Sequence, residues 1–278
     1  MLKMKLKRQI LYESLKRLKE TGENRVYLSD KTQEYIFELL KNKLQKNEHP
    51  NLKNDIVTSP SGPIHKNPAS FNDLLKQLKD NESKEDRLNS LHELCSNYYQ
   101  NIELLFGGGS FNPKIVFLIE SPNLKESQEK ALFTNKVGEL FNKIISAMGI
   151  TNKDIYLCPL FKSHVLLTQY TNGDASKVDE ALTLFKQELD ILSPNIIVGL
   201  GNSIGSYISG NETKPYDQTS DRGVFFKFNG FESIITFSLS SLILKDNLET
   251  KRLLWEDLLQ VMDKLNLNIS EKQRNYFK

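Results

Sequence analysis

The sequence has little of what marks a secreted, membrane-spanning or metal-binding protein. Two cysteines in 278 residues, Cys95 and Cys158, cannot build a disulfide framework and cannot alone supply four ligands to a metal. No apolar run approaches the ~20 residues that a bilayer span needs, and the first twenty residues carry charge throughout instead of the apolar core of a signal peptide. We therefore expect a cytoplasmic protein with no membrane partner.

The charge balance does not by itself favour a polyanionic partner. The net charge is only +2, and the 38% hydrophobic and 26% charged residues are ordinary for a soluble globular protein. Seven lysines and arginines do gather in residues 1–20, against two glutamates. Such a run is more typical of a solvated helix face than of a phosphate-binding surface.

The chain separates into two regions of different pattern. Residues 1–92 predict a helical N-terminal extension, with a linker near 47–70 that is rich in proline, asparagine and serine. Residues 93–268 predict one α/β domain. A total of 278 residues has room for such a domain together with an extension.

Short apolar runs alternate with helical patterns in the second region. Helices are expected over 137–148 and 178–192, where apolar residues recur at helical spacing. Strand, helix, strand, helix implies right-handed crossovers and a parallel sheet with helices on both faces, an α/β/α sandwich. The dipeptide Asn229-Gly230 predicts a hairpin that adds residues 223–228 at one edge. The runs expected to be the main strands are 114–119, 155–161, 195–200 and 233–237.

One carboxylate follows the first of these strands directly. Residues 106–123 read FGGGSFNPKIVFLIESPN, in which Ile115–Ile119 is a buried strand and Glu120 is the next residue. Because open parallel sheets keep their ligands at the carboxyl edge, Glu120 is a candidate site residue. Without further context, an exposed or ion-paired strand end is the simpler interpretation.

Seven segments supply that context, and they read FGGG, IESPN, LFTNKVGELFNKIISAMGI, DIYLCPLFKS, LSPNIIVGLG, TFSLSSLIL and KRLLWEDL. In order and spacing they resemble family 4 of the uracil-DNA glycosylase superfamily, over residues 93–265. The resemblance implies the parallel-sheet α/β/α sandwich of that family. It also implies a DNA partner, single-stranded DNA included, and cleavage of the bond between uracil, or another deaminated base, and its sugar.

The resemblance gives a role to the carboxylate after the first strand. Members of the family rotate the target nucleotide out of the stack, at a cost on the order of a few kcal/mol, and then break its glycosidic bond. A carboxylate beside the sugar orients the attacking water and stabilises the developing positive charge. Glu120 takes this position, with Pro122 at the pocket floor. Phe133 stands where a family phenylalanine stacks on the flipped base, although core packing explains Phe133 equally well.

The resemblance also implies the polar contacts of the pocket. Ser238, the second catalytic candidate, stands where the family has a histidine that donates a hydrogen bond to uracil O2, and Leu239 stands where it has proline. Loss of one such donor typically slows a reaction by ~10²–10³, so we expect excision to be slow or lost. The residues expected at the base edge are Ser238 with Thr168 or Asn172, and those expected at DNA phosphates are Lys162 and Lys245.

The family usually holds an iron–sulfur cluster with four cysteine thiolates. Here the four corresponding positions are Cys95, Tyr98, Ser163 and Ala181, so one ligand of four is present. Cys158 falls inside an expected strand, where it is most simply a small buried apolar residue. We therefore expect no cofactor and no metal, with packed or hydrogen-bonded side chains in the place of the cluster.

The sequence is compatible with three functional hypotheses. The first is a divergent glycosylase that excises a deaminated base through Glu120. The second is a non-catalytic DNA-binding or interaction module derived from a glycosylase. The third, a nucleotide-handling enzyme with a doubly wound sheet, is disfavoured because the glycines of 107–110 precede the strand and cannot form a phosphate-binding turn at a helix N-terminus.

Overall fold

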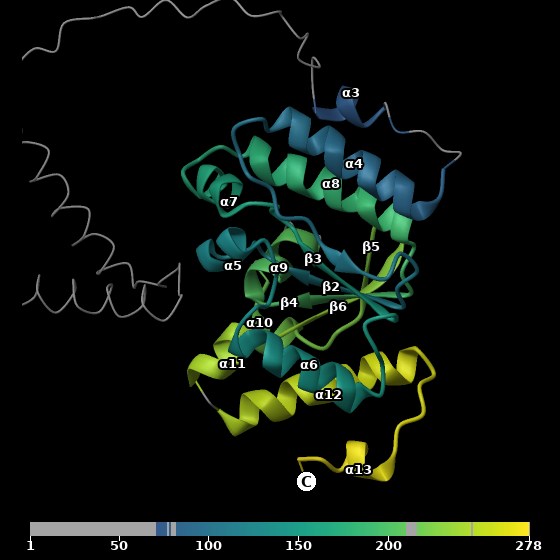
Figure 1. Ribbon diagram of the computed structural model, residues 1–278. Coiled ribbons are helices and arrows are strands. Elements are labelled where there is room, and N and C mark those ends of the chain that lie inside the picture. Colours follow the sequence, from purple (N-terminus) through teal and green to yellow (C-terminus); the bar gives the residue numbers. More distant parts are fainter. Residues whose placement is uncertain (1–70, 77, 79–81, 210–215, 246, 278) are drawn as a thin grey trace, which may run out of the picture. The chain divides into compact units, whose positions relative to one another are not determined.

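The computed structural model describes residues 71–278, apart from 77, 79–81, 210–215, 246 and 278 (Figure 1). The chain divides into two compact units, Met1–Lys66 and Asn67–Lys278, and all described residues belong to the second. The expected N-terminal helices and the linker near 47–70 lie outside the described residues. Within the part that the structure describes, no helix is both long enough and apolar enough to cross a bilayer.

The α/β unit starts earlier than the sequence suggested. The expected boundary between residues 92 and 93 falls inside one continuous helix, α4 (Lys84–Tyr98). Its buried residues Leu88, Leu91 and Cys95 belong to the same apolar core as one face of the sheet. This helix is therefore part of the α/β unit and not of a separate extension.

A six-stranded sheet with the order β1-β3-β2-β4-β6-β5 forms the centre of the unit. The four inner strands β3, β2, β4 and β6 run parallel, and both edge strands are antiparallel to their neighbours. This confirms the parallel sheet expected from the four apolar runs. The strand bounds are β1 (Gly108–Gly109), β2 (Ile115–Ile119), β3 (Ile155–Pro159), β4 (Ile196–Leu200), β5 (Phe226–Phe228) and β6 (Phe231–Thr236).

Both edges of the sheet depend on glycine. The hairpin between β5 and β6 is confirmed, with Asn229 and Gly230 at φ of 49° and 83°, the left-handed values that a type I′ turn requires. Strand β1 was not expected. It pairs with β3 so closely that a Cβ on Gly109 would lie 2.3 Å from the Ile155 carbonyl oxygen. The glycine run thus serves the close approach of an edge strand.

Helices cover both faces of the sheet (Figure 1). The helices predicted over 137–148 and 178–192 are confirmed as α6 and α8, on opposite faces. One core joins β2, β3 and β4 to the first layer, and a second core joins the other side of these strands to the second layer. The first layer has α3 (Phe71–Leu75), α4, α7 (His164–Thr171), α8 (Ser176–Leu192) and α9 (Asn202–Ile208), and the second α6 (Lys136–Met148), α11 (Leu239–Lys245) and α12 (Leu248–Lys264).

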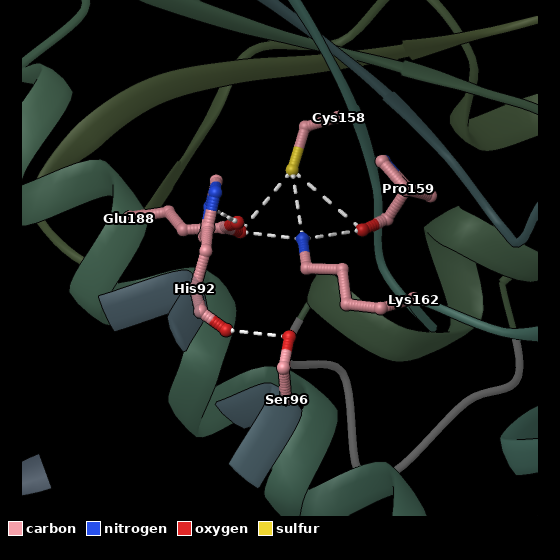
Figure 2. Close-up of polar contacts among 6 residues, drawn as sticks. All are labelled: His92, Ser96, Cys158, Pro159, Lys162 and Glu188. Carbon is pink, nitrogen blue, oxygen red and sulfur yellow. Dashed lines mark hydrogen bonds and ion pairs between the residues drawn. The ribbon is translucent and has the colours of Figure 1, made fainter. Parts of the chain in front are cut away.

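A buried cluster of polar side chains ties the first layer to the carboxyl end of β3 (Figure 2). The Lys162 ammonium lies 2.6 Å from Glu188 Oε2, 2.7 Å from the Pro159 carbonyl oxygen and 3.2 Å from Cys158 Sγ. His92 Nε2 lies 3.1 Å from the second oxygen of Glu188. We call His92, Cys158, Lys162 and Glu188 the Lys162 cluster. Glu188, Cys158 and the Pro159 carbonyl oxygen together give all three ammonium protons a partner.

This cluster is inside the protein, not at its surface. The Lys162 and Glu188 side chains are 1% and 0% exposed. Burial opposes the charge of Glu188, but the Lys162 ammonium and His92 outweigh it and hold the pKa of this carboxyl below its ordinary value. Because an ammonium with 1% exposure cannot reach a DNA backbone, the expected phosphate contact of Lys162 does not fit this placement.

Replacement of Glu188 by glutamine is expected to lower the free energy of unfolding by about 3–5 kcal/mol, because it leaves the Lys162 ammonium buried without its counter-charge. Urea unfolding followed by circular dichroism measures this change. The same replacement at Glu256, whose ion pair with Arg252 is 46% and 45% exposed, is the matched control. It should cost less than about 1 kcal/mol.

A double variant distinguishes the effect of an unpaired buried charge from the effect of lost packing. Lys162→Met with Glu188→Leu removes both charges and keeps most of the buried volume, so it should unfold at a higher urea concentration than Glu188→Gln. An unchanged unfolding midpoint and slope for Glu188→Gln would contradict the structural role of the ion pair.

Candidate functional site

Four chain segments meet at the carboxyl edge of the sheet, each directly after a parallel strand. The Phe161 amide, after β3, donates to the Glu120 carbonyl oxygen, after β2, at 2.9 Å. The Gly201 amide, after β4, donates at 2.9 Å to the carbonyl oxygen of Thr236, the last residue of β6. Because β4 separates β2 from β6, the ends of these two strands lie about 10 Å apart. Glu120 and Ser238 therefore lie at the same edge of the sheet.

The Glu120 carboxylate is half-buried and oriented by an aromatic side chain. The Tyr207 hydroxyl donates to Glu120 Oε1 at 3.2 Å. The Tyr207 ring packs on Phe161 and Tyr170, with centroid separations of 5.7 and 5.8 Å, and Phe161 stacks on Tyr170 at 5.7 Å. We call Phe161, Tyr170 and Tyr207 the aromatic cluster. It gives the carboxylate an apolar wall on one side and a fixed hydrogen-bond donor.

The aromatic cluster was missed from the sequence, although one signal for it exists. Tyr207 lies on α9, the helix that leaves the carboxyl end of β4. A tyrosine in the second turn of such a helix can reach the end of the neighbouring strand β2. Tyr170 reaches the same place from α7, at the far end of that helix, and nothing local in its sequence marks it.

The Ser238 hydroxyl caps the turn that follows β6. Its oxygen accepts from the Ser241 amide at 3.3 Å, and the Ser241 hydroxyl donates to the Ser238 carbonyl oxygen at 2.7 Å. Gly201, at φ of 112°, packs against this turn, and a Cβ there would lie 3.2 Å from Ser238 Cβ. Since the Ser238 oxygen acts as an acceptor in these contacts, its proton can still be donated to a ligand.

The Phe133 side chain lies in a loop that a buried glutamate holds in place. Glu126, 4% exposed, accepts the Phe133 amide at 2.8 Å and the Asn123 amide at 2.9 Å. Phe133 has a left-handed φ of 56°, and a Cβ on Gly138 would lie 1.7 Å from its carbonyl oxygen. The loop therefore has one tightly determined conformation, and the glycine at its side is required.

The Phe133 ring lies between the core and a cavity. It packs edge-on against Phe141 with a centroid separation of 5.2 Å, so it belongs partly to the core. It also lines a cavity of about 440 Å³, together with Phe106, the glycines 107–109 and Asn142. In the described part of the chain, the lining of this cavity does not include Glu120.

The remaining predicted residues are distributed unevenly around the edge. Pro122 is buried beside Glu120, and Thr168 and Asn172 are exposed at α7 and its C-terminal cap. The Thr168 hydroxyl donates to the His164 carbonyl oxygen of its own helix at 2.9 Å. Lys245 is the last residue of α11, and its side chain lies outside the described residues.

The residues at the four expected cluster positions do not fit an iron–sulfur cluster. Burial, followed by the Glu188 carboxylate, raises the pKa of the Cys95 thiol to about 12, whereas cluster ligands are thiolates. The Ser163 oxygen caps α7 by accepting the Val165 amide, and Tyr98 packs edge-on against Phe71. Ala181 has no ligand atom. Among the described residues, no group of three or more histidine, cysteine or acidic side chains could hold a metal ion.

Protein purified anaerobically is expected to contain no stoichiometric iron and to lack the broad visible absorbance of an iron–sulfur cluster, because only one of the four ligand positions, Cys95, holds a thiol and burial keeps that thiol protonated. Elemental analysis and an absorption spectrum of the same sample test this. Four irons per chain, with matching sulfide, would overturn it.

Comparison with known proteins agrees with this geometry. The family model described as the uracil DNA glycosylase superfamily matches residues 106–259, more than half of the chain. A curated relative, the Type-4 uracil-DNA glycosylase of Thermotoga maritima, is 24% identical over 168 residues, which cover 59% of this chain and 84% of that protein. With its sheet, its crossovers and its carboxylate after β2, this chain belongs to the uracil-DNA glycosylase superfamily.

Proposed function

We propose that the protein binds DNA with a uracil or another deaminated base turned into the carboxyl edge of the sheet, and that Glu120 is the carboxylate beside the sugar. The observation that carries this proposal is the position of Glu120 directly after β2, with one oxygen held by Tyr207. The type-4 relative and the family match support uracil-containing DNA as the substrate class.

Bond cleavage in such a site needs two kinds of stabilisation. As the glycosidic bond stretches, positive charge develops on the sugar and negative charge on the leaving base. Glu120 can orient a water molecule and stabilise the positive charge. Tyr207 is a positioning residue, because its hydroxyl fixes the carboxylate and does not reach the base itself in this role.

The negative charge on the leaving base is stabilised less well than the positive charge on the sugar. Ser238 offers one neutral hydroxyl proton, whose oxygen is fixed by the Ser241 amide. Lys162, one of the two lysines expected at this edge, is buried in an ion pair with Glu188 and does not add a positive charge there. We therefore expect excision that is slow, by ~10²–10³ relative to a site with a full complement of donors.

A non-catalytic DNA-binding module is the second candidate function. The observation in its favour is the same replacement of donors at the edge, since binding a turned-out base does not require stabilisation of its anion. A nucleotide-handling enzyme has less support, because the glycines of 107–109 form or flank the edge strand β1 and do not open a helix.

Replacement of Glu120 by glutamine should reduce abasic-site formation at least about 100-fold, because it removes the charge but keeps the shape. The assay uses a single-stranded oligonucleotide with one uracil, and DNA binding is measured separately by fluorescence anisotropy. Glu256→Gln, at an exposed pair with Arg252, is the matched control and should leave both quantities unchanged. Equal cleavage by the Glu120 and Glu256 variants would remove Glu120 from the site.

Replacement of Ser238 by histidine should accelerate excision, by up to ~10²–10³, because it restores a donor to the leaving base. The rate of abasic-site formation under single-turnover conditions is the measurement. Ser240→His, on the exposed side of the same turn, controls for a histidine added nearby. DNA binding without cleavage by either the native protein or Ser238→His would favour the non-catalytic module.

A further inference from the structure

A second groove lies between α6, α12 and the C-terminal segment that carries α13 (Glu271–Arg274), away from the carboxylate. Its volume is about 440 Å³, within the range of ligand-binding pockets. Leu242 of α11, four residues after Ser238, lines one end of it. The groove therefore begins close to the turn that carries Ser238, on the helix layer that this turn enters.

The walls of this groove are fixed by hydrogen bonds between distant segments. The Trp255 indole donates to the Gln273 carbonyl oxygen at 2.9 Å, and the Gln273 amide donates to the Ala147 carbonyl oxygen at 2.7 Å. Arg274 pairs with Asp263 at 2.8 Å, which fastens α13 to α12 a second time. These contacts hold the C-terminal segment against α6 and α12.

The lining combines lysine with exposed aromatic surface. Lys143 of α6 and Lys272 of α13 are both exposed, and both line the groove. Tyr276 is 64% exposed, with its ring 6.0 Å from the ring of Trp255 and 4.9 Å from that of Phe277. Among the lining residues that the structure describes, none is acidic. Charge and composition are those of a surface on which phosphates and unpaired bases bind together.

We propose that this groove binds single-stranded DNA outside the base pocket, with a base stacked on Tyr276 and phosphates near Lys143 and Lys272. The proposal rests on the proposed function only for the identity of the nucleic acid, and it does not require excision. Because an aromatic ring can stack on any base, binding should be independent of the DNA sequence. Because the lysines contact phosphates, the affinity should fall as the salt concentration rises.

Other occupants have less support from the same observations. The first twenty residues of this chain carry seven lysines and arginines, so the lysines of the groove would repel them. An acidic peptide would satisfy Lys143 and Lys272, but it would leave the exposed face of Tyr276 without a planar partner. A single strand of DNA uses both features.

The groove contains a natural fluorophore. Trp255 is the only tryptophan in the chain and lines the groove, and although it is buried, its ring lies 6.0 Å from that of Tyr276, so a base stacked on Tyr276 changes its surroundings. Titration of the full-length protein with a 12-residue oligothymidylate, which contains no uracil, should quench its fluorescence. The quenching should weaken as salt rises.

Three surface variants test the contacts. Lys143→Glu with Lys272→Glu should lower the magnitude of the slope of log affinity against log salt by at least about 1.4, the value for two lost phosphate contacts. Tyr276→Ala should weaken binding at least about fivefold at fixed salt. Lys227→Glu, on the exposed edge strand β5, is the matched control and should bind like the native protein. Thermal unfolding verifies that each variant is folded.

The outcomes separate this proposal from the function above. Quenching that the groove variants weaken and the control does not supports the groove, whether or not uracil is excised. Excision that persists while oligothymidylate causes no quenching, or quenching that the groove variants leave unchanged, overturns the groove but not the glycosylase function. Equal quenching by a 12-residue polyglutamate would assign the groove to an acidic protein segment instead.

Discussion

The buried ammonium of Lys162 is the constraint on which the carboxyl edge depends. A charge that is 1% exposed is tolerated only with a counter-charge and full hydrogen bonding, and Glu188, Pro159 and Cys158 supply both. These partners fix the chain directly after β3. The next residue back, Phe161, donates its amide to the backbone carbonyl oxygen of Glu120 and packs its ring on Tyr207, whose hydroxyl donates to the Glu120 carboxylate, so the position of the carboxylate depends on the position of the lysine.

The same ion pair joins the segments that four cluster ligands would join. The four positions that the family resemblance implied are Cys95 and Tyr98 on α4, Ser163 four residues after β3, and Ala181 on α8. The Lys162 cluster also takes His92 from α4, Cys158 and Lys162 from the end of β3, and Glu188 from α8. Electrostatic attraction in a dry interior thus connects three elements that a metal cluster would otherwise connect.

Local patterns in the sequence predicted the architecture. Short apolar runs predicted β2, β3 and β4, and Asn229-Gly230 predicted the hairpin, because each signal acts over a few neighbouring residues. The strand end placed Glu120 at the sheet edge, but only the family resemblance favoured it as a site residue, and its role stays a prediction. The burial of Lys162 could not be predicted, because Glu188 is 26 residues away and a lysine after a strand usually reaches solvent. Strand β1 was missed for a similar reason: its pairing depends on the close approach of Gly109 to Ile155.

Burial of Lys162 also redistributes the charge available to a DNA ligand. At the carboxyl edge its ammonium is neutralised by Glu188, and Ser238 contributes no charge, so the carboxylate of Glu120 faces a bound base without a nearby cation from either residue. The phosphates on either side of that nucleotide would be repelled by the negative charge of Glu120. In the proposed function, lysines beyond Lys162 and Ser238 would attract a polyanion, and Lys143 of α6 and Lys272 of α13 line the second groove. Binding and chemistry would then use separate surfaces in the proposed function, so that DNA binding would not depend on the rate of cleavage.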